Sequence, residues 1–82
     1  MSEDLTARII EIIAKTAHKP VESITADSTF EEIGVDSLDG IQVLFALEQE
    51  FDISISDEAA KEIRGIPDVV AGVQQLIEAK SA

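Results

Sequence analysis

Residues 36–51 have the sequence DSLDGIQVLFALEQEF, and this stretch decides the fold class. Asp36 is of a residue type that caps helices, and Asp39 follows three residues later, so a helix is expected to begin just after Asp36. Apolar residues then recur at three- and four-residue spacing, which is typical of an amphipathic helix. We predict a helix over residues 37–51, with Ser37 in its first turn.

The apolar residues of this helix form two stripes. The first stripe is made of Val43, Leu44, Leu47 and Phe51. The second is made of Leu38, Ile41 and Phe45, and Glu48 continues its face. One stripe is enough to build the core of a small bundle. Burial of the second stripe is the commoner arrangement, but an apolar strip bordered by carboxylates is also typical of a docking surface for a partner with an apolar groove and a basic rim.

The rest of the chain adds three helices and one long loop. Helical spacing of apolar residues predicts helices over residues 3–17 and 67–79, and Ser56 is expected to cap a short one over residues 57–63. Gly65 fits the position that follows a helix end, and Pro67 fits the first position of the next helix. Residues 20–35 have no sustained period, but their apolar residues predict an ordered loop with one helical turn near residues 30–33.

These elements predict an all-α four-helix bundle with a long ordered loop between helices 1 and 2 and a short third helix. The length of 82 residues implies a single domain over residues 1–82. There is no cysteine, no apolar run near the roughly 20 residues that span a bilayer, and acid at Glu3 and Asp4 where a signal peptide has basic residues. We therefore expect a cytoplasmic protein without a membrane span. We also expect it to be a monomer.

Charge is segregated along the chain. The net charge is −11, and no Lys or Arg lies between residues 20 and 61. The basic residues are Arg8, Lys15, Lys19, Lys61, Arg64 and Lys80. Such a field repels nucleic acid and anionic lipid and attracts protein partners that carry Lys or Arg patches. The central acidic segment is therefore predicted to face partner proteins and not nucleic acid.

The sequence offers little catalytic chemistry of its own. His18 is the single histidine, and without a second histidine or a cysteine the usual nucleophilic triads are excluded. No zinc spacing or glycine-rich phosphate loop is present, and the EF-hand pattern fails because Val35 stands at its first ligand position. We expect no catalytic residue and no metal site. Ser37 remains, because a hydroxyl at a helix N-terminus is exposed and the helix dipole there favours an attached phosphate.

At this point the chain resembles the acyl carrier proteins over essentially its whole length. The resemblance is carried by residues 30–39, FEEIGVDSLD, continued by residues 46–51 and 55–58. It implies that a phosphopantetheinyl transferase attaches 4'-phosphopantetheine covalently to Ser37, with Asp36 and Leu38 on either side as further cofactor-binding residues. It also implies that the terminal thiol of this arm carries acyl groups as thioesters to enzymes of fatty acid, lipid or polyketide biosynthesis. The protein itself would then be a carrier and not an enzyme.

The resemblance further implies partner contacts on the acidic second helix of the bundle. Acyl-transferring and chain-elongating enzymes with basic patches would bind there. The residues expected to meet them are Asp39, Ile41, Phe45, Glu48 and Glu50. Departures from the common family pattern indicate a carrier specialised for particular partners, and they fall at Gly40, Gln42, Phe45, Gln49 and Ser56. The alternative is a small acidic helical adaptor that binds basic partners without a prosthetic group.

Overall fold

The computed structural model describes the backbone of residues 2–81 and the side chains of residues 4–80, so Met1 and Ala82 of the predicted domain lie outside the described residues. The elements are α1 (Ser2–Ala17), the 3-10 helix η1 (Val21–Ser23), α2 (Phe30–Ile33), α3 (Ser37–Phe51), α4 (Asp57–Glu62) and α5 (Ile66–Ser81). The predicted all-α class is confirmed, and the predicted helical turn near residues 30–33 is α2. The observed bounds of the four longer helices differ from the predicted ranges by at most two residues.

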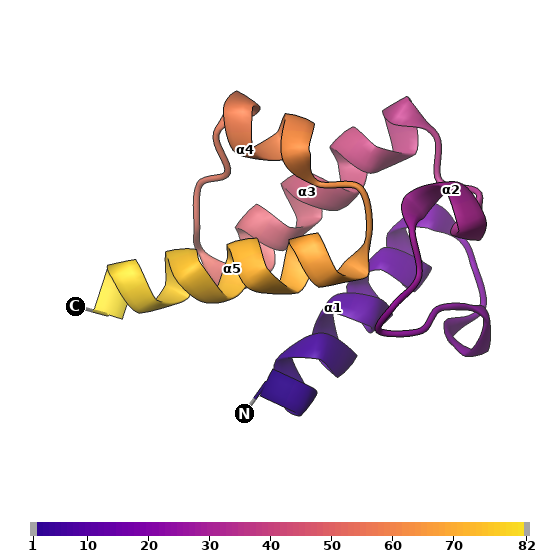
Figure 1. The fold of residues 1–82 in the computed structure, drawn as a ribbon, viewed down its shortest axis with the longest axis horizontal. Coiled ribbons are helices and arrows are strands. Elements are labelled where there is room, and N and C mark those ends of the chain that lie inside the picture. Colours follow the sequence, from indigo (N-terminus) through magenta and orange to yellow (C-terminus); the bar gives the residue numbers. More distant parts are fainter. Residues whose placement is uncertain (1, 82) are drawn as a thin grey trace.

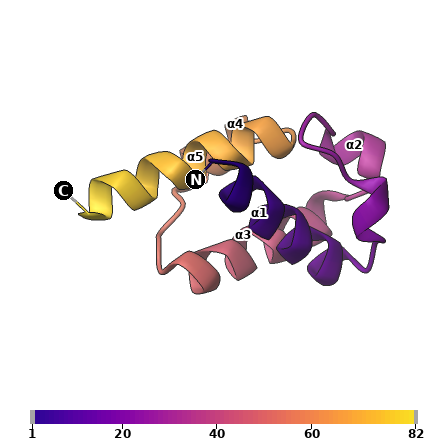
Figure 2. The same ribbon diagram turned by 90° about the horizontal axis from the view of Figure 1, so that it is seen from below.

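The two longest helices, α1 and α5, pack against each other, and α1 also packs against α3. Figures 1 and 2 show α1 packed between α3 and α5, while α2 lies at one end of the molecule beside the first turns of α3. The molecule measures about 35 × 26 × 19 Å along its principal axes. The start of α3 therefore lies at one end of the bundle, close to both α2 and α4.

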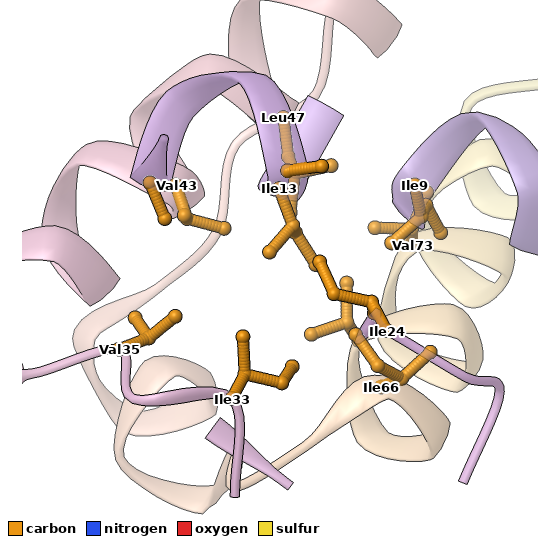
Figure 3. Packing of buried hydrophobic residues seen from close by; sticks show 12 residues of the cluster. Ile9, Ile13, Ile24, Ile33, Val35, Val43, Leu47, Ile66 and Val73 are labelled. Atoms are coloured by element: carbon orange, nitrogen blue, oxygen red, sulfur yellow. The ribbon is translucent and has the colours of Figure 1, made fainter. Parts of the chain in front are cut away.

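The core is aliphatic and draws on α1, α2, α3, α5 and the loop residues Ile24 and Val35, whereas η1 and α4 contribute no buried side chain. Figure 3 shows its side chains pointing toward one another from α1, the loop, α3 and α5. The buried residues are Ile9, Ile13, Ala14, Ala17, Ile24, Ile33, Val35, Val43, Leu47, Ile66, Val69 and Val73. Val43 and Leu47 are fully buried and belong to the first stripe of α3, so that stripe builds the core as predicted.

Three helices end in the same backbone arrangement. His18, Gly34 and Asp52 each follow a helix and adopt a left-handed conformation, with φ of 58°, 87° and 54°. The next residue then donates its N–H to a carbonyl five residues earlier, which is the Schellman motif. These bonds are Lys19 N to Ala14 O (2.8 Å), Val35 N to Phe30 O (2.9 Å) and Ile53 N to Glu48 O (3.1 Å). Each of these three helices therefore ends abruptly. The motif at the end of α2 is followed directly by Asp36.

Gly65 has a different role from the one its place in the sequence suggested. It does not follow a helix end in the left-handed conformation, because α4 ends at Glu62 and Gly34 is the glycine with positive φ among the described residues. Gly65 instead forms an isolated antiparallel bridge with Thr29. A Cβ atom on Gly65 would lie 2.7 Å from the Ser28 carbonyl oxygen. The prediction of a helix-end glycine was therefore wrong, and close approach of two backbones is the reason for glycine here.

The bridge is reinforced by backbone hydrogen bonds on both sides of Gly65. Phe30 N donates to Arg64 O at 2.9 Å, and Ile66 N donates to Ser28 O at 2.8 Å. These bonds tie the start of α2 to the turn between α4 and α5, although the two segments are far apart in the sequence. Among the helices of residues 2–81, none combines the length and apolar character needed to cross a bilayer.

An exposed ion pair joins the ends of α3 and α5. Lys80 Nζ donates to Asp52 Oδ2 at 2.5 Å and to Asp52 O at 2.9 Å. The hydrogen bond from Lys80, together with its charge, lowers the pKa of the Asp52 carboxyl below its usual value. A carboxyl whose pKa is lower in the folded state stabilises the fold above its unfolded pKa, and this contribution is lost as the pH falls through the folded pKa.

We expect Lys80→Gln to return the Asp52 pKa to the ordinary range of an aspartate. The measurement is an NMR titration of the Asp52 carboxyl carbon in both proteins. The difference in stability between wild type and variant should be small, because the pair is exposed, and it should shrink further in high salt. It should also vanish at acid pH. An unchanged Asp52 titration in the variant would contradict the assignment of the shift to Lys80.

Candidate phosphopantetheine site

Ser37 is held at the surface by a well-defined helix start. Asp36 is the N-cap of α3, and its Oδ1 accepts a hydrogen bond from Asp39 N at 2.9 Å. Val35, on the other side of Asp36, is buried in the core. Ser37 is exposed, and its hydroxyl forms no hydrogen bond with another residue in the described part of the chain. The segment thus presents a free hydroxyl at the first residue of a helix, where the backbone N–H groups favour an attached phosphate.

An open pocket lies beside Ser37, between α2, α3 and α4. Its volume is about 550 Å³. Phe30, Val35, Ile41, Leu44 and Ile63 contribute apolar wall, while Asp36, Ser37 and Gly40 line it from the start of α3. Gly40 has open space where a Cβ would stand, so the absent side chain widens this end of the pocket. A group attached to Ser37 would have this pocket next to it.

The sequence and fold match those of known carriers. Residues 7–73 match the family model described as "Phosphopantetheine attachment site". An acyl carrier protein of Rickettsia bellii is 34% identical over 74 residues, which cover 89% of this chain and 86% of that protein. One from Phenylobacterium zucineum is 34% identical over 77 residues, covering 93% and 98%. The crystal structure of an acyl carrier protein from Thermotoga maritima superimposes with a TM-score of 0.86 at 32% identity, covering 96% of this chain and 93% of that one.

This chain belongs to the acyl carrier protein family. Its function is to carry acyl groups, and its prosthetic group is 4'-phosphopantetheine. The family consists of carriers and not of catalysts, and its members interact with phosphopantetheinyl transferase and with biosynthetic enzymes. The pocket and the free hydroxyl beside it fit this prosthetic group, because they leave room for a long substituent at Ser37 without displacing a core residue.

The second apolar stripe of the carrier lies at the surface and not in the core. Leu38, Ile41 and Phe45 are 65%, 65% and 62% exposed. A row of large apolar side chains with such exposure is more typical of an interaction surface than of ordinary solvent-exposed surface. Leu38 is the residue directly after Ser37, so this surface, here called the α3 strip (Leu38, Ile41, Phe45), begins at the proposed attachment point.

The acidic residues predicted to border the strip differ in whether their carboxylates are bound by other residues of the fold. Asp39 is half-buried, and its carboxylate has no partner among the described residues. Glu48 is half-buried, and its Oε2 accepts a hydrogen bond from Ile55 N at 2.7 Å, so it anchors the loop after α3. Glu50 pairs with Arg8 of α1, whose guanidinium also lies 5.5 Å from the centre of the Phe51 ring. Two of the three acids therefore contribute to the fold as well as to the surface charge.

Sequence reasoning missed the two cations of the pocket. Lys61 and Arg64 line it together with Ser37, although they lie 24 and 27 positions further along the chain. They stand just outside the acidic segment in the sequence, and no local pattern shows that the fold returns them to Ser37. Among the side chains of residues 4–80, no group of three or more His, Cys, Asp or Glu is arranged to hold a metal ion.

Proposed function

We propose that Ser37 is the residue to which the 4'-phosphopantetheine arm is attached. The observation that supports this is the exposed, unpaired Ser37 hydroxyl at the first residue of α3, next to an open pocket. Asp36 fixes the helix start that presents the hydroxyl, and Leu38 supplies apolar surface immediately beyond it. When bound, the arm supplies a terminal thiol that forms thioesters, which no side chain of this cysteine-free protein can do.

Attachment would proceed in the complex with a phosphopantetheinyl transferase and coenzyme A. Ser37 Oγ forms a bond to the phosphorus that carries the pantetheine. The bond from that phosphorus to the adenosine bisphosphate breaks, and the hydroxyl proton passes to a base of the transferase. The carrier's own contribution is position: an N-capped first turn holds Oγ at the surface, so little ordering is needed when the transferase binds.

The α3 strip is proposed as the surface that partner enzymes bind. Its three apolar side chains would enter a groove in the partner, while Asp39, Glu48 and Glu50 face basic residues at the rim. Exposed ion pairs contribute only about 0–1 kcal/mol each, so they favour rapid encounter and rapid release. A monomeric carrier that must pass from enzyme to enzyme needs such transient binding. We place this work in the cytoplasm, where reducing conditions keep the arm's thiol free.

Loading of the apo protein tests the proposal. The protein is incubated with coenzyme A, Mg²⁺ and a promiscuous phosphopantetheinyl transferase, and its intact mass is measured. We expect a single phosphopantetheine adduct, which peptide mapping assigns to Ser37. A well-folded protein that gains no adduct, or gains one at another serine, would refute the assignment.

Phe45→Ser should weaken recognition by partners without weakening the fold. Loss of one exposed anchor side chain is expected to lower kcat/KM for loading by the transferase roughly tenfold. The matched control is Val21→Ser, which removes an exposed apolar residue outside the strip and should leave loading unchanged. Thermal unfolding of both variants should stay close to wild type. Equal loading rates for Phe45→Ser and wild type would contradict a docking role for the strip.

A further inference from the structure

Two cationic side chains of the Ser37 pocket have no partner among the described residues. Lys61, in α4, and Arg64, just after it, are exposed and line the pocket. In the described part of the chain, neither side chain forms a hydrogen bond or an ion pair. Arg8 and Lys80, by contrast, each pair with a carboxylate. Glu31 and Asp36 line the same pocket, yet neither is within ion-pair distance of Lys61 or Arg64.

The backbone around Arg64 is firmly placed. Arg64 O accepts the hydrogen bond from Phe30 N, and Arg64 N donates to Asp68 Oδ2 at 3.0 Å. Gly65 lies against the backbone of Ser28 and Thr29, which leaves the turn no room to shift toward α2. Arg64 is therefore fixed opposite the start of α3, and α4 places Lys61 on the same wall of the pocket.

We propose that Lys61 and Arg64 are positioning residues that bind the phosphodiester of the arm. This inference rests on the proposed attachment at Ser37, which puts one phosphodiester charge at the mouth of the pocket. The surrounding acidic segment repels that charge, and Lys61 and Arg64 are the cations that line the pocket. Charge-assisted hydrogen bonds from Arg and Lys to phosphate oxygens are strong, and unpaired cations form them without breaking an existing pair. The arm would thus be held over the pocket and not extended into solvent.

The test compares backbone amide chemical shifts of apo and loaded protein by 1H–15N NMR. In wild type, loading should shift the amides of residues 61–64 as well as those around Ser37. The shifts at residues 61–64 should fall by at least half in about 1 M NaCl, where the screening length is about 3 Å. They should be lost in the double variant Lys61→Gln/Arg64→Gln and kept in Lys61→Arg/Arg64→Lys. Lys15→Gln, which removes another exposed and unpaired cation, should leave them unchanged.

The outcomes separate this inference from the proposed attachment. Intact mass and peptide mapping first establish that Ser37 is loaded; a missing adduct would refute the attachment itself. A loaded Ser37 with amide shifts confined to its own neighbours would overturn only the role of Lys61 and Arg64. The role of Lys61 and Arg64 would also be overturned if the shifts at residues 61–64 persisted in the double variant, or if salt did not reduce them in wild type. The salt titration uses wild-type protein, so it decides the question even if the double variant folds poorly.

Discussion

Ser37→Ala is expected to abolish attachment of phosphopantetheine completely while leaving the fold intact. The Ser37 hydroxyl is exposed and has no partner among the described residues, so its removal breaks no interaction of the native state. Alanine is also the best helix former, and exposed substitutions of this kind usually change stability by no more than about 0.5 kcal/mol. Loading followed by intact mass should therefore show no adduct on a protein with wild-type thermal unfolding.

Ser54→Ala provides the matched control for this experiment. Ser54 is also exposed, but it lies in the loop between α3 and α4 and not at a helix start. Its replacement should leave loading unchanged. An adduct that persists on Ser37→Ala would disprove the assignment. A stable complex with a partner enzyme that is equally tight in wild type and in unloaded Ser37→Ala would instead favour the adaptor function, in which the prosthetic group plays no part.

Gly65→Ala is expected to cause the largest loss of stability of any single methyl addition to a glycine of this fold. The new Cβ would lie 2.7 Å from Ser28 O and 2.9 Å from Thr29 Cα, and both are backbone atoms that cannot rotate away. Relief requires the two segments to separate, which strains the hydrogen bonds from Phe30 N and Ile66 N. Overpacking of this kind costs about 1–3 kcal/mol, and a backbone clash belongs near the upper end. The melting temperature should fall by roughly 10–20 °C.

Gly72→Ala is the control for Gly65→Ala. Gly72 lies within α5, and nothing stands within 4 Å of the position its Cβ would occupy. A helical glycine replaced by alanine without a clash stabilises a protein by up to about 1 kcal/mol. Thermal unfolding should therefore move in opposite directions for the two variants. Equal stability of Gly65→Ala and wild type would show that the bridge between Thr29 and Gly65 does not constrain the fold.

Most of the fold could be predicted because it follows from local rules. Helical spacing located the helices, and side-chain caps at Asp36 and Ser56 located two of their starts. The division of α3 into a core stripe and a second stripe was also visible, although the sequence left burial of the second stripe open. Only packing decides that question: α1 packs against α3, and Val43 and Leu47 are fully buried, whereas Phe45 remains exposed.

The features that sequence reasoning missed depend on contacts between distant segments. Glu48 was predicted to be a surface acid, but its bond to Ile55 N exists only because the loop after α3 turns back over the helix. Gly65 was assigned to a helix end because its contact with Ser28, 37 positions earlier in the chain, leaves no local sequence pattern. Lys61 and Arg64 were missed as well, because only the tertiary fold places them in the pocket beside Ser37. The proposed attachment serine could be picked out from the local sequence, whereas the residues that line its pocket could not.

The bridge between Thr29 and Gly65 also decides which wall of the pocket can move. The amides of Phe30 and Ile66 are both engaged across it, so the starts of α2 and α5 behave as one rigid body whose amides should exchange slowly with solvent. The six residues of α4 have no buried side chain and should open at far lower free energy. We therefore expect α4 to be the mobile wall of the pocket, opening about its C-terminal end at Ile63, while the bridged segments at the starts of α2 and α5 keep their places.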